Sequence, residues 1–161
     1  LLAFNRLSRS DRITVAPLDL EVVASEVAAA EGWSRPEIEL GIEGSAVCRA
    51  DAGLVARALS NLVRNAVKHA SGRVRISLSM EGGHACASVA DDGPGFDPML
   101  AGKLGRPFVK DPASTGSGLG LAIVERVAAL HGGRVEYARA PEGGACVRLC
   151  LPLRTDGPDR Y

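Results

Sequence analysis

A long helical pattern that passes directly into two strand patterns constrains the fold of this chain most. Between positions 51 and 70, apolar residues recur at helical spacing and form one face of a helix. Residues 73–80 then alternate between polar and apolar side chains, a Gly-Gly pair at 82–83 signals a turn, and residues 85–91 alternate back. A helix and a hairpin that each have one apolar face predict an α+β domain in which these faces pack together.

The other segments supply the rest of a two-layer α/β sandwich. Asp19 is a plausible N-cap for a helix at 20–30, and 1–9 resembles the end of another helix. We expect a mixed, mostly antiparallel sheet covered on one face by about three helices. The remaining predicted elements are a strand at 13–16 that Pro17 stops, strands at 37–42 and 46–49, a helix at 118–131, and a hairpin at 134–138 and 145–151.

Composition excludes several classes of function. Apolar residues make up 46% of the 161 residues, which favours one domain with a packed core. Nineteen basic and nineteen acidic residues cancel, so no overall charge favours nucleic acid or an acidic membrane as a partner. No apolar run approaches the roughly 20 residues that span a bilayer, and no signal peptide is recognisable, so we expect a cytoplasmic location. The chain starts with Leu1 instead of Met, which indicates a fragment of a longer protein.

The cysteines and histidines show no metal-binding pattern. The four cysteines form neither a Cys-x-x-Cys pair nor a zinc spacing, although Cys146 and Cys150 would lie on one face of a strand. We expect reduced thiols packed in the core, and no disulfide. For His84 and His131, a solvated position or stabilisation by a helix dipole is the expectation.

The long helix carries a polar stripe made of Arg57, Asn61, Arg64 and Lys68, with Asn65 at its border. The two asparagines are four residues apart, so their side chains project from neighbouring turns. Carboxamide oxygens are hard, neutral ligands that suit Mg²⁺, and a lysine ammonium can meet phosphate oxygens. The alternative is an ordinary solvated helix face.

Asp91 ends a strand and leads into the turn Asp92-Gly93-Pro94-Gly95. A carboxylate held there can accept a hydrogen bond from an exocyclic amine such as that of adenine. The glycines let the backbone approach a flat ring closely. The alternative is an ordinary Asp-Gly turn.

A glycine-rich loop at 116–120 precedes an apolar-periodic helix, after a long irregular stretch from 96 to 117. Free backbone N–H groups and the positive end of the helix dipole make such a loop a natural anion site. The loop matches neither the Walker spacing nor the dinucleotide-binding spacing. The alternative is a flexible hinge with one helix cap.

The order and spacing of these patches resemble the catalytic and ATP-binding domain of bacterial two-component sensor histidine kinases, in the wider group that includes gyrase B, Hsp90 and MutL. The segment 61–69 is similar to the N box of that family, 91–95 to its G1 box, Pro107-Phe108 to its F box and 116–121 to its G2 box. The resemblance implies the Bergerat-type ATP-binding fold. It covers residues 11–153, with 1–10 as the end of a dimerisation and phosphoacceptor hairpin and 154–161 as a disordered tail.

The resemblance also implies roles for individual residues, with ATP and Mg²⁺ as the bound groups. Asn65 would coordinate Mg²⁺ with the support of Asn61, and Lys68 would contact phosphates; these three would be the catalytic residues. Asp91 would bind the adenine amine. Residues 97–117 would form a lid over the nucleotide. The other implied nucleotide contacts are His69 (where the family more often has an aromatic residue), Gly93, Gly95, Phe108, Lys110, Gly116, Ser117, Gly118, Leu119 and Gly120.

One residue distinguishes activities within the group that the chain resembles. ATP-hydrolysing members carry a glutamate where Asn61 stands, and an amide cannot act as a general base near neutral pH. The resemblance therefore implies a histidine kinase, which passes the γ-phosphate to a histidine on the preceding hairpin for relay to a response regulator. No histidine precedes His69 here, so the chain should bind ATP without phosphorylating itself.

The resemblance leaves two other functions as alternatives. One is a serine kinase of the anti-sigma type, which lacks the hairpin, and the other is a non-enzymatic module that binds a nucleotide for protein contacts. For the fragment itself we expect a monomer with no nucleic-acid partner and no membrane contact. The parent protein would be a homodimer, which a membrane anchor could hold at the inner face of the membrane.

Overall fold

The computed structural model describes residues 12–100, 102–106 and 119–154, and these contain three α-helices and seven β-strands. The helices are α2 (Leu20–Glu31), α3 (Ala52–His69) and α4 (Gly120–Leu130), and two short 3-10 helices lie at Gly32–Ser34 and Pro98–Leu100. The strands are β1 (Ala16–Asp19), β2 (Glu39–Gly44), β3 (Val47–Ala50), β4 (Arg73–Glu81), β5 (His84–Asp91), β6 (Arg134–Arg139) and β7 (Ala145–Pro152).

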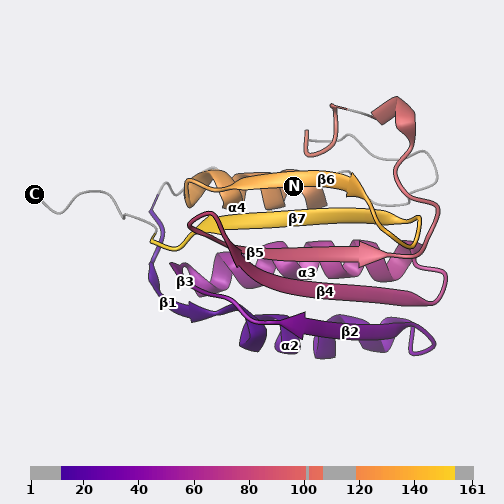
Figure 1. The fold of residues 1–161 in the computed structure, drawn as a ribbon, viewed down its shortest axis with the longest axis horizontal. Helices are drawn as coiled ribbons and strands as arrows, with labels where there is room; N and C mark the ends of the chain where they lie inside the picture. Colours follow the sequence, from indigo (N-terminus) through magenta and orange to yellow (C-terminus); the bar gives the residue numbers. More distant parts are fainter. Residues whose placement is uncertain (1–11, 101, 107–118, 155–161) are drawn as a thin grey trace, which may run out of the picture.

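The strands form one large sheet and one small one. The large sheet has the order β2-β4-β5-β7-β6, in which β2 and β4 run parallel and the other neighbours run antiparallel. β1 pairs antiparallel with β3 in a separate two-stranded sheet. The three helices lie on one face of the large sheet (Figure 1). This arrangement confirms the predicted α+β sandwich with a mixed, mostly antiparallel sheet.

The core lies between the helices and the sheet, and α3 is its central helix. Val55, Leu59 and Leu62 of α3 are at most 2% exposed. They share one hydrophobic cluster with Ile76 of β4 and Leu149 of β7. The apolar residues that recur at helical spacing on α3 and those that alternate on the strands therefore pack against each other in one core, as the sequence predicts.

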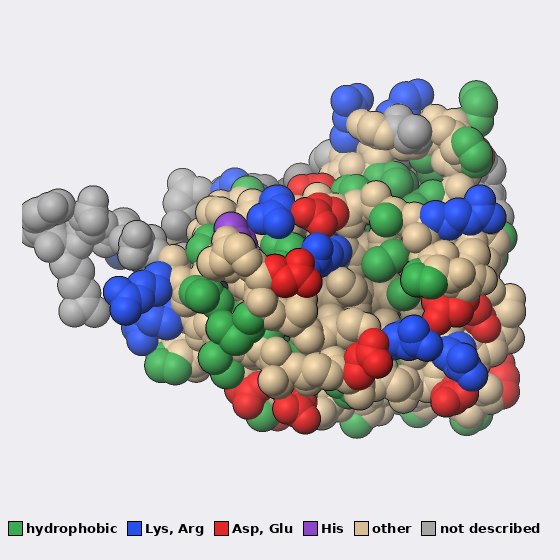
Figure 2. All heavy atoms as spheres, in the orientation of Figure 1, with side chains coloured by type: hydrophobic (Ala, Val, Ile, Leu, Met, Phe, Trp, Pro, Cys, Tyr) green, Lys and Arg blue, Asp and Glu red, His purple; other side chains and the backbone are tan. Residues whose placement is uncertain are grey.

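The other face of the large sheet carries charged side chains. Figure 2 shows acidic and basic groups interspersed over this face. Several of them form ion pairs, among them Arg75 with Glu142 at 3.0 Å and Arg148 with Glu136 at 3.5 Å. An antiparallel sheet commonly has one such solvated face opposite its core.

The first strand differs from its prediction. β1 begins at Ala16, whereas the sequence predicts a strand at 13–16 that Pro17 ends. Pro17 instead lies inside β1 and pairs with Arg49 of β3. Both strands of a two-stranded sheet are edge strands. An edge strand tolerates proline where the backbone N–H would point to solvent, because no hydrogen bond of the sheet is then lost.

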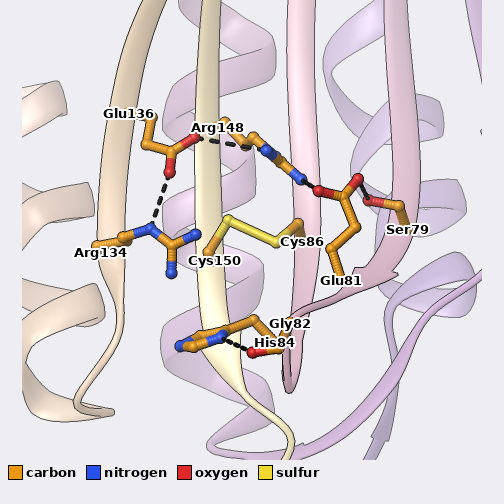
Figure 3. The surroundings of a disulfide bond; sticks show 9 residues. All are labelled: Ser79, Glu81, Gly82, His84, Cys86, Arg134, Glu136, Arg148 and Cys150. Atoms are coloured by element: carbon orange, nitrogen blue, oxygen red, sulfur yellow. Dashed lines mark hydrogen bonds and ion pairs between the residues drawn. A yellow bond between two sulfur atoms is a disulfide. The ribbon is translucent and has the colours of Figure 1, made fainter.

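The cysteine prediction is wrong for one pair. Cys86 of β5 and Cys150 of β7 are directly paired in the sheet, and a disulfide joins them (Figure 3). Their Cα atoms are 4.2 Å apart. Cys48 and Cys146 are free thiols, as expected. The register of β5 against β7 brings Cys86 and Cys150 together. This register cannot be predicted from the spacing of the cysteines along the chain.

Several predictions lie outside the described residues. These are the helix end at 1–9, the residues from 107 to 118, and the tail beyond position 154. Arg154, at the predicted start of that tail, forms an isolated parallel bridge with Arg49 of β3.

Candidate nucleotide site

α3 begins at a well-capped N-terminus. Asp51 accepts a hydrogen bond from the Leu54 N–H at 3.1 Å through one carboxylate oxygen, and from the Thr14 N–H at 2.8 Å through the other. These bonds satisfy donors that have no acceptor inside the helix. The helix then runs for 18 residues and carries its polar stripe to the opposite end.

Asn61, on the polar stripe of α3, lies next to the start of α4. Asn61 and Asn65 are partly exposed and Lys68 is exposed. The Asn61 amide donates to the Arg57 carbonyl at 2.9 Å, which leaves its oxygen directed elsewhere. That oxygen lies 3.5 Å from the position that a Cβ atom on Gly120 would occupy. The structure thus brings a residue of the predicted N box next to a glycine of the predicted G2 box.

Asp91 is a buried carboxylate at the end of β5. It is 5% exposed, and its Oδ1 accepts hydrogen bonds from the Gly93 N–H at 2.8 Å and the Ala145 N–H at 3.4 Å. Burial raises the pKa of Asp91 above its ordinary value of 3.8, and the two N–H groups oppose that rise. Among the described residues, none donates a hydrogen bond to Oδ2, so this oxygen can accept one from a ligand.

Gly144 and Ala145 contribute to this environment and were missed from the sequence. A Cβ atom on Gly144 would overlap the backbone and carboxylate of Asp91, so only glycine permits the close approach. The Ala145 N–H donates to Asp91 across 54 positions of sequence. The Gly143-Gly144 pair was a visible turn signal, but nothing in it indicates which residue the turn contacts.

The turn after Asp91 is tied to the C-terminal end of α3. Asp92 Oδ1 accepts the N–H groups of Ser71, Gly72 and Arg73 at 2.8, 3.0 and 3.1 Å. These backbone bonds, led by that of Gly72, hold the pKa of Asp92 below its usual value. Gly93 lies so close to the carbonyl of His69 that a side chain would not fit between them. The predicted G1 and N boxes are therefore in direct contact.

The N-terminus of α4 has the character of an anion site. The Ile123 N–H donates to the Leu119 carbonyl at 2.9 Å. The N–H groups before Ile123 have no acceptor within the helix and lie at the positive end of its dipole. The Asn61 oxygen lies beside Gly120 at this end, so a carboxamide of α3 and the first N–H groups of α4 are neighbours.

Phe96 and Tyr137 fix the start of the segment that follows the G1 turn. Their rings pack edge to face with centroids 6.1 Å apart, and the Tyr137 hydroxyl donates to Glu125 at 2.8 Å. Burial, followed by this bond to a carboxylate, raises the pKa of Tyr137 well above its ordinary value. Gly105, with φ +85°, lies against the same Glu125 and Tyr137 side chains. Phe96 and Gly105 thus both lie against Tyr137 of β6.

The structure brings most of the described candidate residues to one edge of the fold. Asn61, Asn65, Lys68 and His69 lie on α3, Asp91, Gly93 and Gly95 lie at the end of β5, and Leu119 and Gly120 open α4. Phe108, Lys110, Gly116, Ser117 and Gly118 are outside the described residues.

Of the two positions expected for His131, the solvated one is wrong, and the residue lies buried at the C-terminal end of α4. It is 2% exposed, and its Nε2 accepts the Asp51 N–H at 3.0 Å. Its Nδ1 therefore carries the proton and donates to the Val127 carbonyl at 2.7 Å. His131 is a buried, neutral link between the end of α4 and the N-cap of α3, and not a solvated cation.

The donor set of the site suits a hard cation. The described residues contain no cluster of three or more His, Cys, Asp or Glu side chains that could hold a metal. The Asn61 and Asn65 carboxamides supply neutral oxygens, which fit Mg²⁺ in a site where the substrate contributes phosphate oxygens. Asn61 Oδ1 is available for this because its amide nitrogen is the atom that binds Arg57.

Comparison with known proteins identifies the family. The family model described as histidine kinase-, DNA gyrase B- and HSP90-like ATPase matches residues 50–155. This range includes α3, the end of β5 and α4, and so contains the whole site described above. The chain belongs to this ATPase family.

Relatives within the ATPase family are sensor histidine kinases. The histidine-protein kinase AfsQ2 of Streptomyces coelicolor is 34% identical over 148 residues, which are 88% of this chain and 28% of AfsQ2. The structure of the mycobacterial sensor histidine kinase MprB is 30% identical with a TM-score of 0.77 and covers 89% of this chain and 100% of its own. ShkA in complex with AMPPNP is 33% identical with a TM-score of 0.83, over 98% of this chain and 35% of its own.

The chain corresponds to the ATP-binding catalytic domain of these kinases. It spans little more than a quarter of AfsQ2, so most of a protein of that kind lies outside it. Within the described residues, no helix has both the length and the apolar character needed to cross a membrane.

Proposed function

We propose that this chain binds ATP with Mg²⁺ and transfers the γ-phosphoryl group to a histidine on a helical hairpin domain of its parent protein, for relay to a response regulator. The observation that carries the proposal is the meeting of three unlike groups at one edge of the fold. They are the buried Asp91 carboxylate, the carboxamides of α3 and the first N–H groups of α4. The histidine kinase relatives favour this activity over a serine kinase or a non-enzymatic module.

The Asp91 end of the site suits adenine. A carboxylate that receives its protein bonds on Oδ1 can accept the exocyclic amine of adenine on Oδ2. Gly93 and Gly144 let the backbone pack tightly around Asp91 and fix its direction. The AMPPNP in the ShkA complex supports an adenine nucleotide as the ligand.

The α3 and α4 end of the site suits the phosphates. Asn65, with the support of Asn61, would hold Mg²⁺, which when bound neutralises charge on the phosphate oxygens. Lys68 would add a positive charge on the same side. The first N–H groups of α4 would receive the terminal phosphates, as helix N-termini commonly do.

The transfer step uses an acceptor from outside this chain. The lone pair of the acceptor imidazole attacks the γ-phosphorus, an N–P bond forms, and the bond from the γ-phosphorus to the β–γ bridging oxygen breaks. ADP leaves, and the other imidazole nitrogen loses its proton to solvent. Because the Asn61 amide cannot take up a proton, it cannot activate water in competition with the imidazole. We therefore expect slow hydrolysis and transfer only when the hairpin is supplied.

Calorimetric titration with a non-hydrolysable ATP analogue tests the binding part of the proposal. We expect saturable binding that strengthens when Mg²⁺ is added. Asp91→Asn should weaken it by about tenfold to hundredfold, because a hydrogen bond to a charged acceptor is worth about 1.5–3 kcal/mol. Absence of binding by the wild-type chain, with and without Mg²⁺, would refute the proposal.

Labelled ATP tests the transfer part. The chain is incubated with the hairpin domain of its parent protein, and the acid-labile label on that domain is counted. Label should appear on the hairpin histidine and disappear when that histidine is replaced with alanine. Binding of ATP without any label on the hairpin would leave a nucleotide-binding module and exclude the kinase.

We also propose that the fragment is cytoplasmic and monomeric. Sedimentation of the chain alone would test the monomeric state.

A further inference from the structure

Arg35 lies outside the four sequence motifs but contacts the end of the helix that carries two of the candidate phosphate-binding residues. It follows the 3-10 helix Gly32–Ser34 as its C-cap, with φ and ψ of −140° and 77°, outside the helical region. Pro36 comes next, and a residue before proline disfavours the helical region. The local sequence therefore turns the chain at Arg35 and sends its side chain toward α3.

The Arg35 guanidinium binds the carbonyl groups at the C-terminal end of α3. Nη1 donates to the carbonyls of Val67 at 3.0 Å and Ala70 at 2.9 Å, with the Lys68 carbonyl at 3.4 Å. The last carbonyls of a helix have no intrahelical donor, and a cation there also interacts favourably with the helix dipole. The Nε atom is held by Glu37 at 2.9 Å, so the side chain is fixed on both sides.

The opposite side of the same helix end is held by the G1 turn. Gly93 lies against the His69 carbonyl, and Asp92 binds the N–H groups of the residues that follow the helix. The last turn of α3 is thus held between Arg35 on one side and Asp92-Gly93 on the other. Lys68 and His69 lie on this turn, and Asp91 lies on the strand beside it.

We infer that Arg35 is a positioning residue that holds the phosphate end of the nucleotide site by fixing the last turn of α3. The inference rests on the proposed function. Without Arg35, the Val67 and Ala70 carbonyls would turn to water and the last turn of α3 would loosen, together with the Lys68 and His69 side chains. Asp91 would keep its place, because its bonds come from Gly93 and Ala145. Loss of Arg35 should therefore weaken contacts to phosphate and spare contacts to adenine.

The test compares two ligands on matched variants by NMR titration. Arg35→Gln should weaken binding of the ATP analogue with Mg²⁺ by about tenfold, because a loosened Lys68 would lose a charged hydrogen bond to phosphate, while adenosine affinity stays within about twofold. Arg35→Lys keeps the charge and one set of donors and should restore most of the lost affinity. Arg73→Gln removes an arginine that pairs with Glu39 at 3.3 Å on the open face of the sheet, and should bind both ligands as the wild type does.

The outcomes separate this inference from the proposed function. If the wild-type chain binds the analogue but Arg35→Gln binds it equally well, the inference fails and the proposed function stands. An equal loss for adenosine and analogue would also overturn the inference, because it would show a general structural role. If the wild-type chain binds neither ligand, the proposed function fails first. Amide exchange reports whether Arg35→Gln is folded, and in a folded variant it should accelerate at 67–70 and stay slow in the core of α3.

Discussion

The two ends of α3 are fixed by different kinds of contact. At the N-terminus, Asp51 caps the helix and its own N–H is bound by His131, a neutral and fully buried ring. At the C-terminus, the partly exposed Arg35 guanidinium and the Asp92 carboxylate hold the chain. The N-terminal contacts close the core, whereas the C-terminal contacts surround side chains that face solvent and could meet a ligand.

This difference separates stability from binding. A buried neutral link is costly to remove because its partners lose their hydrogen bonds without gaining water. A partly exposed charged contact is less costly, since water can replace it, but it determines where a side chain points. Changes at the N-terminal end should therefore lower the free energy of unfolding, and changes at the C-terminal end should lower nucleotide affinity.

The largest effect on stability is expected at His131. His131→Phe fills the same space but leaves the Asp51 N–H unpaired in the core, whereas the Val127 carbonyl keeps its bond from the backbone N–H of residue 131. The substitution should lower the free energy of unfolding by about 2 kcal/mol. Urea unfolding measures this change, and His84→Phe at the β4–β5 turn is the matched control. Nucleotide affinity of the folded protein should change by less than about twofold. A stable His131→Phe with weakened ATP binding would reverse the comparison between the two ends.

The next largest effect is expected at Asn65, toward the other end of α3. Asn65→Ala removes the proposed Mg²⁺ ligand and should weaken analogue binding in Mg²⁺ at least about tenfold. The free energy of unfolding should change by less than about 0.5 kcal/mol, since the side chain is partly exposed and makes no described hydrogen bond that folding needs. Titration in EDTA provides the control, because wild type and variant should bind equally there. A loss that is the same in EDTA would exclude Asn65 as the metal ligand.

The parts of the fold that depend on local periodicity could be predicted from the sequence. α3, the β4–β5 hairpin and the β6–β7 hairpin follow from apolar spacing and glycine turns, and the cap of α2 follows from Asp19. The candidate positions on α3 and β5 followed from the type and spacing of polar residues. Their meeting at one edge of the fold, next to α4, was implied by a family resemblance and not by the spacing itself.

The parts that depend on contacts between distant segments could not be predicted. Arg35 reaches Val67 across 32 positions, and Ala145 reaches Asp91 across 54. The pairing of Cys86 with Cys150 depends on the register of β5 against β7, which follows from the packing of the whole sheet. The position of His131 at a helix end is visible in the sequence, whereas its burial against Asp51 is not.

A smaller effect is expected at the middle of α3, on a side away from the nucleotide. Glu31 of α2 accepts hydrogen bonds from Ser60 at 2.6 Å and from Arg64 at 3.0 Å, and its side chain is 16% exposed. Glu31→Gln keeps an acceptor but loses the charge, which should lower the free energy of unfolding by about 1 kcal/mol at pH 7. Glu26→Gln, at an exposed position of α2, is the control and should not measurably change the free energy of unfolding.

The pH dependence of this variant follows from the pKa of Glu31. The hydrogen bond from Arg64 is the main cause that holds this pKa below its ordinary value of 4.5. A carboxyl with a lowered folded pKa contributes stability above the unfolded value, and the contribution is lost as pH falls through the folded pKa. The difference in the free energy of unfolding between the wild type and Glu31→Gln should therefore be constant near neutral pH and shrink as the pH falls below 4.5. A difference that persists unchanged in acid would show that Glu31 acts by packing, and nucleotide affinity should be the same in both proteins at neutral pH.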